Sequence, residues 1–156
     1  MTGLRACILG AGGGIGGALT DLVGAAGYET VYAGARAPLS GTLPALRAFS
    51  FDLLDEASLV EAAERIAADG PLDLVIVATG MLHRDGSLPE KSFRQIDATG
   101  MQDVFAVNAI GPALAARHFL PLLPRDRRAV MAFLSARVGS IGDNRLGGWH
   151  SYRASK

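Results

Sequence analysis

The feature that most constrains the fold is a glycine-rich segment at residues 10–17, GAGGGIGG. Before it, residues 5–9 form a compact, mainly apolar run that is typical of a buried strand. After it, apolar residues recur at helical spacing from Ile15 to Ala26, and Gly27 ends the pattern. The segment therefore predicts a strand, a tight turn and a helix in direct succession.

This turn suits a phosphate group, because glycines let a pyrophosphate approach the backbone N–H groups at the start of the helix. A tight turn without a ligand is the alternative. Two spacings fit: Gly12, Gly14 and Gly17 match G-x-G-x-x-G, whereas Gly10, Gly14 and Gly16 match G-x-x-x-G-x-G. We favour the second, because Gly10 directly follows the strand. The Lys-Ser or Lys-Thr pair that a P-loop ATPase requires does not follow the glycines.

The rest of the chain alternates between strand and helix patterns. Further strands are expected at residues 29–33, 47–51, 72–77 and 129–134. Helices are expected at residues 55–69 and 97–123, the second of them broken near Gly111-Pro112. Such alternation implies right-handed crossovers between parallel strands. We therefore predict a single α/β domain over residues 1–156, with a doubly wound parallel sheet of five strands of the Rossmann type.

The charge balance excludes several classes of partner. The chain has 15 basic and 15 acidic residues, so it lacks the positive surface that nucleic acid or an anionic membrane would attract. Its apolar runs are far shorter than the ~20 residues of a membrane-spanning helix, and no secretory signal pattern opens it. A single cysteine, Cys7, excludes an internal disulfide, and three widely separated histidines argue against a metal site. We expect a cytoplasmic protein.

The end of the second strand bears on the choice of dinucleotide. An NAD site places an acidic side chain there to bind the ribose hydroxyls, whereas an NADP site places a cation beside the 2′-phosphate. This chain has Arg36 and no acid at that point. A solvated loop residue is the alternative reading of Arg36. The pattern favours NADP(H) over NAD(H).

Near the end of the sequence, Tyr152 and Lys156 are four residues apart, so they share one face of a helix. An ammonium group on that face stabilises a phenolate, which makes the phenol a usable proton donor. The pair therefore predicts acid catalysis by Tyr152 with the assistance of Lys156.

Together with the glycine turn, this pair resembles the active-site and cofactor motifs of the short-chain dehydrogenase/reductase family. The details are closest to C-factor-like proteins and sniffer-type carbonyl reductases. The resemblance is carried by GAGGGIG at residues 10–16, PEKS at 89–92, VNAIGP at 107–112, VGSI at 138–141 and SYRASK at 151–156. It implies an oxidoreductase that transfers hydride between NADP(H) and a small carbonyl or alcohol, and it implies a homo-oligomer.

The resemblance also implies roles for individual residues. The catalytic set is Tyr152 as proton donor, Lys156 beside it and on the nicotinamide ribose, Asn108, and a serine that orients the carbonyl. The cofactor set is Gly10, Gly14, Ile15, Gly16, Arg36, Asp52 and Gly80. Asp52 matches a position that contacts adenine in the family, and a turn or helix cap is the alternative.

Asn108 matches a helix residue whose backbone carbonyl, in the family, holds a water connected to the active-site Lys. Pro112 gives a local reason for this role, because it has no N–H and leaves the carbonyl four residues earlier without its helical partner. A kink that only shapes the helix is the alternative.

The chain departs from the family pattern at two places. It has VATG at residues 77–80 where the family has Asn-Asn-Ala-Gly, so only Gly80 is retained. Ala136 occupies the position of the serine that contacts the substrate carbonyl, so Ser135 or Ser140 would have to replace it. We name Ser135 as the catalytic serine, and a hydroxyl that only caps the loop is the alternative. Ser135 alternates to the wrong face of the strand unless the strand bulges or ends before it.

The sequence closes at Lys156, and the family builds much of its substrate pocket from segments after the Tyr-Lys pair. We therefore expect that the helices and strands completing the pocket are missing from these 156 residues, and that the 156-residue chain by itself is inactive. A dinucleotide-binding signalling module without turnover and an inactive truncated product stay open as alternatives.

Overall fold

The computed structural model describes residues 3–39, 44–84 and 86–156, and these contain a five-stranded parallel sheet. The strands are β1 (Arg5–Leu9), β2 (Thr30–Ala35), β3 (Leu46–Ser50), β4 (Leu74–Val77) and β5 (Val130–Phe133). Their order is β3-β2-β1-β4-β5, so the winding direction reverses between β1 and β4. This is the doubly wound α/β fold that the sequence predicts, and every observed strand end lies within two residues of the expected one.

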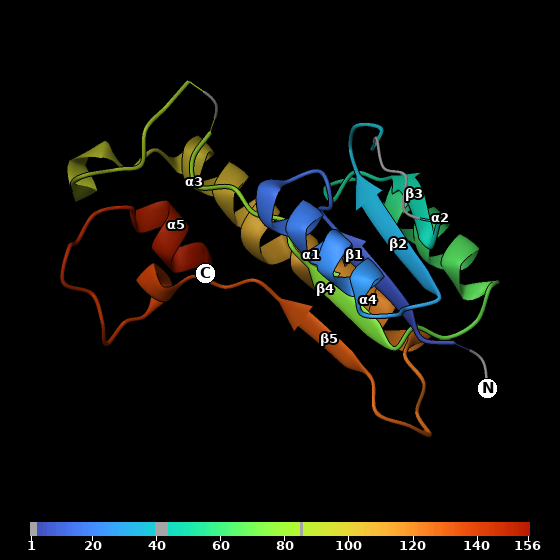
Figure 1. Ribbon diagram of the computed structural model, residues 1–156. Helices are drawn as coiled ribbons and strands as arrows, with labels where there is room; N and C mark the ends of the chain where they lie inside the picture. The colour runs from blue at the N-terminus through green and yellow to red at the C-terminus, as the bar shows by residue number, and fades with distance from the viewer. Residues whose placement is uncertain (1–2, 40–43, 85) are drawn as a thin grey trace.

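Five α-helices accompany the sheet in the described part of the chain. They are α1 (Gly14–Ala25), α2 (Glu56–Ala67), α3 (Ala98–Phe105), α4 (Gly111–Phe119) and α5 (His150–Ser155), with short helical turns at Phe93–Gln95, Ala106–Ile110, Leu120–Leu122 and Arg137–Gly139. Helix α1 covers one face of the sheet, and α2 and α4 pack together on the other (Figure 1). Helix α5 lies beside α3, beyond the carboxyl ends of the strands.

The side chains of β1 are buried on both faces of the sheet, which explains its nearly continuous apolar sequence. Cys7 and Leu9 belong to the larger core under α2 and α4, together with Phe119. Ala6 and Ile8 face the smaller core under α1. Burial raises the pKa of the Cys7 thiol, so Cys7 acts as a core residue and not as a nucleophile.

Helix α1 begins at the glycine turn, but its buried face differs from the one that the apolar spacing predicts. Gly16, Thr20 and Val23 are buried, whereas Ile15 and Leu22 are 64% and 66% exposed. The cause is the close approach of the helix to the turn, because a Cβ on Gly16 would lie 2.1 Å from a carbonyl oxygen of the turn. Small residues therefore face the sheet at this end, and larger apolar ones face outward.

The helix expected at residues 97–123 is divided into α3 and α4 by a wider, π-helical turn at Ala106–Ile110. This turn stands immediately before Gly111-Pro112, where the sequence predicts a break. The backbone of Gly111 stays helical, with φ of −57° and ψ of −49°, and its N–H bonds to the carbonyl of Ala106. A Cβ on Gly111 would lie 2.5 Å from the Cγ of Leu53, so the glycine lets α4 approach the loop before α2.

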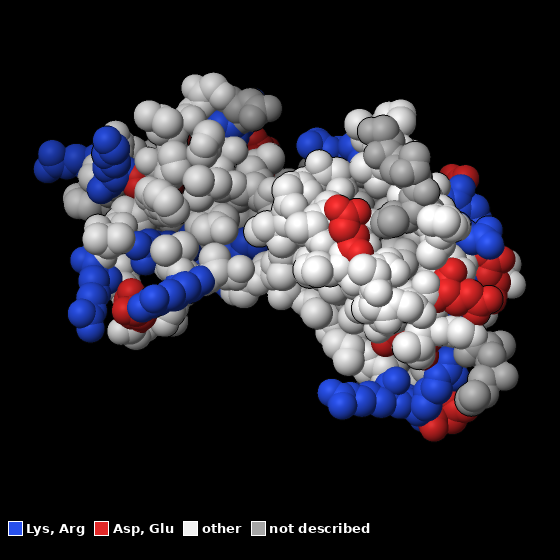
Figure 2. Space-filling model, in the orientation of Figure 1, with Lys and Arg blue, Asp and Glu red and all other residues white. Residues whose placement is uncertain are grey.

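Charged side chains of both signs are spread around the molecule, and the surface over α1 carries few of them (Figure 2). This distribution agrees with the equal numbers of basic and acidic residues in the sequence. In the described part of the chain, no helix has the length and apolar character needed to cross a membrane.

Candidate active site

The glycine turn lies at the carboxyl edge of the sheet, between the ends of β2 and β4. Gly10 has a φ of +98°, and its N–H and that of Ala11 each donate a 2.9 Å hydrogen bond to the carbonyl of Gly34. A Cβ on Gly10 would lie 3.0 Å from the backbone of Ala78 and Thr79. The turn therefore stands where the strand order reverses, which is where doubly wound folds bind their ligands.

The three glycines of the favoured spacing have different surroundings. A Cβ on Gly16 would overlap the Gly10 carbonyl, and a Cβ on Gly10 would meet the backbone of Ala78 and Thr79. A Cβ on Gly14, the first residue of α1, would have no heavy atom within 4 Å, and the next residue, Ile15, is exposed. The start of α1 thus faces open space, and its first N–H groups are accessible to an anion.

Lys156 directs its ammonium group toward the ends of β4 and β5. Its Nζ donates a 2.8 Å hydrogen bond to the carbonyl of Leu134 and lies 3.4 Å from the position of a Cβ on Gly80. The same nitrogen is 6.0 Å from the centroid of the Tyr152 ring. Burial lowers the pKa of Lys156. The structure thus brings Gly80, Tyr152 and Lys156 together.

Asn108 connects α5 with the loop after β4. Its Nδ2 donates to the carbonyl of Met81 at 2.8 Å and to the Oγ of Ser155 at 2.9 Å, and its Oδ1 accepts from the N–H of Met81 at 2.8 Å. The Oδ1 is 3.7 Å from the position of a Cβ on Gly80. The sequence motif predicts a role for the backbone carbonyl of Asn108, whereas the structure shows that its side chain also braces the loop.

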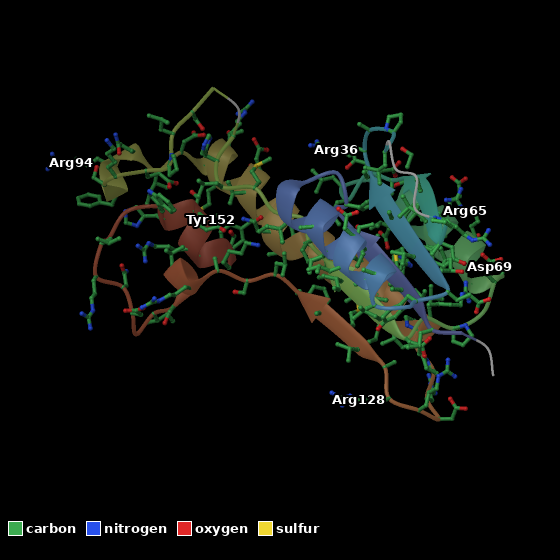
Figure 3. All side chains as sticks on the ribbon, in the orientation of Figure 1. Arg36, Arg65, Asp69, Arg94, Arg128 and Tyr152 are labelled. Carbon is green, nitrogen blue, oxygen red and sulfur yellow. The ribbon has the colours of Figure 1, made fainter. Side chains whose placement is uncertain are left out.

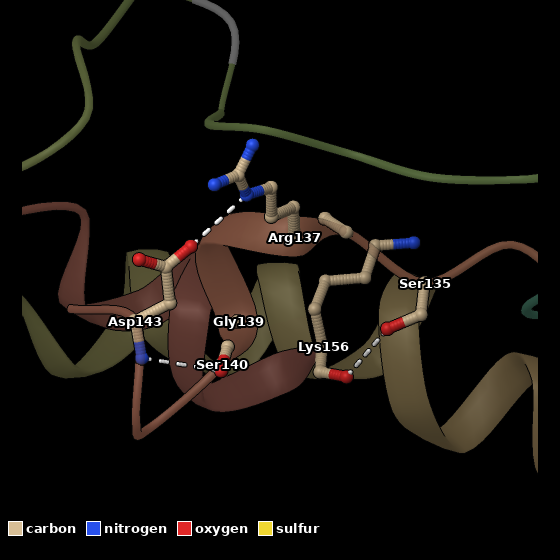
Figure 4. A pocket seen from close by; sticks show the side chains of 7 residues that line it. Ser135, Arg137, Gly139, Ser140, Asp143 and Lys156 are labelled. Carbon is tan, nitrogen blue, oxygen red and sulfur yellow. Dashed lines mark hydrogen bonds and ion pairs between the residues drawn. The ribbon is translucent and has the colours of Figure 1, made fainter.

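A pocket of about 580 Å³ opens beside Lys156 (Figure 4). It is lined by Ser135, Ala136, Arg137, Gly139, Ser140, Asp143 and Lys156. Because β5 ends at Phe133, Ser135 lies beyond the strand, and the expected conflict with strand alternation does not arise. The Oγ of Ser135 donates to the carbonyl of Lys156 at 3.0 Å, and the Oγ of Ser140 accepts from the N–H of Asp143 at 3.3 Å. Both candidate serines therefore line the pocket.

The remaining candidate cofactor residues follow β2 and β3. Arg36 is exposed directly after the end of β2 (Figure 3), and it forms no ion pair with any carboxylate in residues 3–39, 44–84 and 86–156. Asp52 shapes the turn before α2, because its Oδ1 accepts from the N–H of Leu54 at 2.9 Å and its backbone bonds to the Ser58 hydroxyl. This is the capping role left open by the sequence, and the adenine contact stays a prediction.

Two features of the site escaped the sequence analysis. The Oγ1 of Thr79, which stands in the altered VATG segment, is buried with no hydrogen-bond partner among the described residues. Glu90, in the PEKS segment, binds the start of α5 through Ser151. No group of three or more His, Cys, Asp and Glu side chains in the described ranges is placed to hold a metal ion.

Known proteins with similar sequences indicate the family to which the chain belongs. The family model for short chain dehydrogenases matches residues 5–156. A 1-hydroxy-2-glutathionyl-2-methyl-3-butene dehydrogenase from Rhodococcus sp. (strain AD45) is 34% identical over 109 residues, which are 67% of this chain and 43% of that protein. The C-signal protein of Myxococcus xanthus is 31% identical over 87 residues, 56% of this chain and 49% of that protein.

Among solved structures, NADPH bound carbonyl reductase from chicken fatty liver is similar with a TM-score of 0.82 and 26% identity, covering 100% of this chain and 66% of that one. The matches span less than half the length of the two curated relatives above. The family model nevertheless covers nearly every residue of the chain, including the glycine turn and the Tyr-Lys pair. The resemblance found in the sequence is confirmed, and the chain belongs to the short-chain dehydrogenase family.

Proposed function

We propose that the protein is an NADP(H)-dependent oxidoreductase that transfers hydride between nicotinamide and a small carbonyl or alcohol. The observation that carries this proposal is the position of Lys156, whose ammonium lies near both the ring of Tyr152 and Gly80 in the loop after β4. Two relatives support it, since one is named a dehydrogenase and the other a carbonyl reductase with bound NADPH. Because each match covers only part of the relative, the activity is proposed for the whole protein.

The glycine turn fits the pyrophosphate of a dinucleotide. Gly10 and Gly16 keep the turn tight, and the open space at Gly14 leaves the helix N–H groups free to bind phosphate oxygens. In our proposal the guanidinium of Arg36 binds the 2′-phosphate of NADP(H), and Asp52 lies near the adenine. This assignment makes NADP(H) the preferred cofactor over NAD(H).

When bound, NADPH supplies the hydride that the carbonyl carbon accepts. Tyr152 donates its hydroxyl proton to the carbonyl oxygen, so that the carbonyl becomes an alcohol. Lys156 holds a positive charge 6.0 Å from the ring centroid, where it stabilises the phenolate that proton donation leaves. Ser135 or Ser140 orients the carbonyl in place of the serine missing at residue 136. Asn108 braces α5 against the loop after β4 and, through its backbone carbonyl, holds a relay water.

Cofactor preference is tested by titration of NADPH and NADH into the full-length protein. A well-formed contact between guanidinium and phosphate contributes about 1.5–3 kcal/mol, which corresponds to roughly a ten- to hundredfold change in Kd. Arg36→Ala should weaken NADPH by that factor and leave NADH binding unchanged. Arg128→Ala is the matched control, since this exposed arginine lies at the opposite end of the sheet (Figure 3). Equal or tighter binding of NADH by the wild type would contradict the assignment.

Turnover is tested with NADPH and a panel of aldehydes, ketones and quinones. Tyr152→Phe keeps the ring and removes the proton donor, so kcat should fall by about 10²–10⁴ while NADPH affinity changes little. Tyr28→Phe, in the turn between α1 and β2, serves as the control. Ser135→Ala and Ser140→Ala show which hydroxyl orients the carbonyl. Activity retained by Tyr152→Phe would show that another group is the acid.

A dinucleotide-binding protein without turnover is the second candidate. Ala136, which lines the pocket at the position of the family serine, favours it, because this residue offers no side-chain hydrogen bond to a substrate carbonyl. Tight NADPH binding together with no oxidation of NADPH across the whole panel would support this candidate over the first.

A further inference from the structure

Glu90, in the loop between β4 and α3, holds the start of α5. Its Oε1 accepts hydrogen bonds from the N–H of Ser151 at 3.3 Å and from the Ser151 hydroxyl. Its backbone carbonyl accepts the N–H of Trp149. Gly148 permits this approach, since a Cβ there would lie 2.8 Å from the carbonyl oxygen of Glu90. Three hydrogen bonds therefore join this loop to the first turn of the helix.

Helix α5 does not supply such a cap from its own sequence. The residues before it, Gly147, Gly148 and Trp149, all have left-handed φ values, of 63°, 64° and 55°. Trp149 has no side-chain acceptor. A helix leaves its first N–H groups without internal partners, and a helix of only six residues has little stability of its own. Glu90 therefore takes the place of the N-cap residue.

Glu90 makes these bonds as a carboxylate. Its partial burial raises its pKa, but hydrogen bonds from the Ser151 hydroxyl, from its own N–H and from the Ser151 N–H outweigh that effect, and a protonated His150 acts in the same direction. The net pKa of Glu90 is therefore below its usual value. Hydrogen bonds to an ionised acceptor are roughly twice as strong as neutral ones.

The two ends of α5 are held by different parts of the chain. At its end, Ser155 accepts a hydrogen bond from Asn108. At its start, Ser151 is bound by Glu90, and both serines are buried. Tyr152 directly follows Ser151, so the hydrogen bonds between Ser151 and Glu90 also fix the direction in which the Tyr152 side chain leaves the helix.

We propose that Glu90 is a positioning residue for the proton donor Tyr152. By fixing the first turn of α5, it aligns the Tyr152 hydroxyl with the ammonium of Lys156 and with the bound substrate. This inference rests on the proposed function. In the described part of the chain, the hydrogen bonds of Glu90 go to Ser151 and Trp149 and not to Tyr152 or Lys156, so Glu90 acts through the start of the helix.

The test uses Glu90→Ala and Glu90→Gln in the full-length protein, with Glu61→Gln, an exposed glutamate of α2, as the matched control. A misplacement of about 1 Å in an active site can cost about 10²-fold in rate. We therefore expect Glu90→Ala to lower kcat by roughly ten- to a hundredfold, with little change in the Kd for NADPH. Glu90→Gln, whose amide oxygen still accepts without charge, should be intermediate.

Trp149 gives a readout that does not depend on activity, because it is the only tryptophan in the sequence. Glu90→Ala keeps the backbone bond to Trp149 but loses the side-chain bonds to Ser151. The resulting loosening of the first turn should expose Trp149, shift its fluorescence emission to the red and increase quenching by acrylamide. If Glu90→Ala does not fold, Glu90→Gln gives the same comparison.

Wild-type emission, quenching and kcat in the folded Glu90 variants would overturn the proposal. So would a parallel loss of melting temperature, NADPH affinity and kcat, since that pattern marks a general structural role. If the wild type shows no turnover, the proposed function fails separately, and the Trp149 signal decides alone: an unchanged signal in Glu90→Gln overturns the positioning role, and a red shift supports it.

Discussion

Replacing Gly16 with alanine tests how the cofactor turn is built. The added Cβ would lie 2.1 Å from the oxygen and 2.7 Å from the carbon of the Gly10 carbonyl, so the closer contact is about 1.3 Å short of an ordinary 3.4 Å contact. Both atoms belong to the backbone, and no side-chain rotation can relieve the overlap. Helix α1 would have to move away from the end of β1, and the turn would open.

Forced overpacking of this kind costs about 1–3 kcal/mol. For a chain of this size, each kcal/mol corresponds to roughly 2–4 °C in melting temperature, so Gly16→Ala should melt about 2–12 °C below the wild type. Gly17→Ala and Gly14→Ala, also in α1, are the controls, because each substitution gives a similar gain in helix propensity. A Cβ on Gly17 would lie 3.3 Å from the Ala11 carbonyl, which needs only a small adjustment, and a Cβ on Gly14 meets nothing within 4 Å.

Thermal unfolding followed by circular dichroism, together with NADPH titration, separates the three variants. Gly16→Ala should lose both stability and NADPH affinity, and Gly17→Ala should change little in either. Gly14→Ala should keep or gain stability but lose affinity, because its methyl group would occupy the space that we assign to the pyrophosphate. If Gly16→Ala and Gly17→Ala melt together, the close packing of α1 on the turn does not hold, and the preference for the G-x-x-x-G-x-G spacing is refuted.

Two further predictions concern pH and stability. Tyr32→Phe removes the hydroxyl that binds Arg5 and Asp69, so we expect a loss of about 1–3 kcal/mol in unfolding free energy by urea denaturation at neutral pH. Burial and the hydrogen bond to Asp69 raise the pKa of Tyr32, so wild-type stability should fall as the pH rises above about 10; an equal fall in Tyr32→Phe would show that another group titrates. The pKa of Glu90 is lowered in the folded protein, so its carboxylate contributes to folding stability above pH 4.5, the ordinary pKa of the group. This contribution is lost as the pH falls through the folded-state pKa. The melting temperature of Glu90→Gln should therefore depend less on pH in that range than that of the wild type. Parallel plots of melting temperature against pH for the two proteins would exclude the Glu90 carboxylate as the source of the pH dependence.

The fold was predictable because its signals are local. The apolar run of β1, the glycine turn and the helical spacing of α2 each lie within a few residues, and the alternation of strands and helices then fixes the sheet type. The buried face of α1 was missed because it depends on how closely Gly16 approaches the turn, which apolar spacing does not register. The break near Gly111-Pro112 was predicted, but its π-helical form was not. The close approach of Gly111 to Leu53 was missed for a similar reason, since these residues lie far apart in the sequence.

In the candidate site, too, the features formed by residues close in sequence were predictable, and those formed by distant residues were not. The Tyr152-Lys156 pair was readable, because its residues are one helical turn apart. The bonds that orient this pair were not readable, since Asn108 reaches Met81 across 27 residues and Ser155 across 47, and Glu90 reaches Ser151 across 61. Polar contacts over such separations leave no periodic trace in the sequence.

These long-range polar bonds also explain how α5 is fixed. Among the described residues, neither core cluster includes a side chain of α5, so apolar burial does not set the position of this helix. Its buried polar residues are instead Ser151 and Ser155, each bonded to a residue of another segment. Directly after the helix, the partly buried Lys156 donates to the carbonyl of Leu134. Directional hydrogen bonds determine orientation more closely than apolar contacts do. The proposed cofactor turn is thus shaped by backbone packing at Gly10 and Gly16, whereas the proposed catalytic pair is oriented by polar side chains. Substitutions at these two places should therefore separate cofactor affinity from turnover.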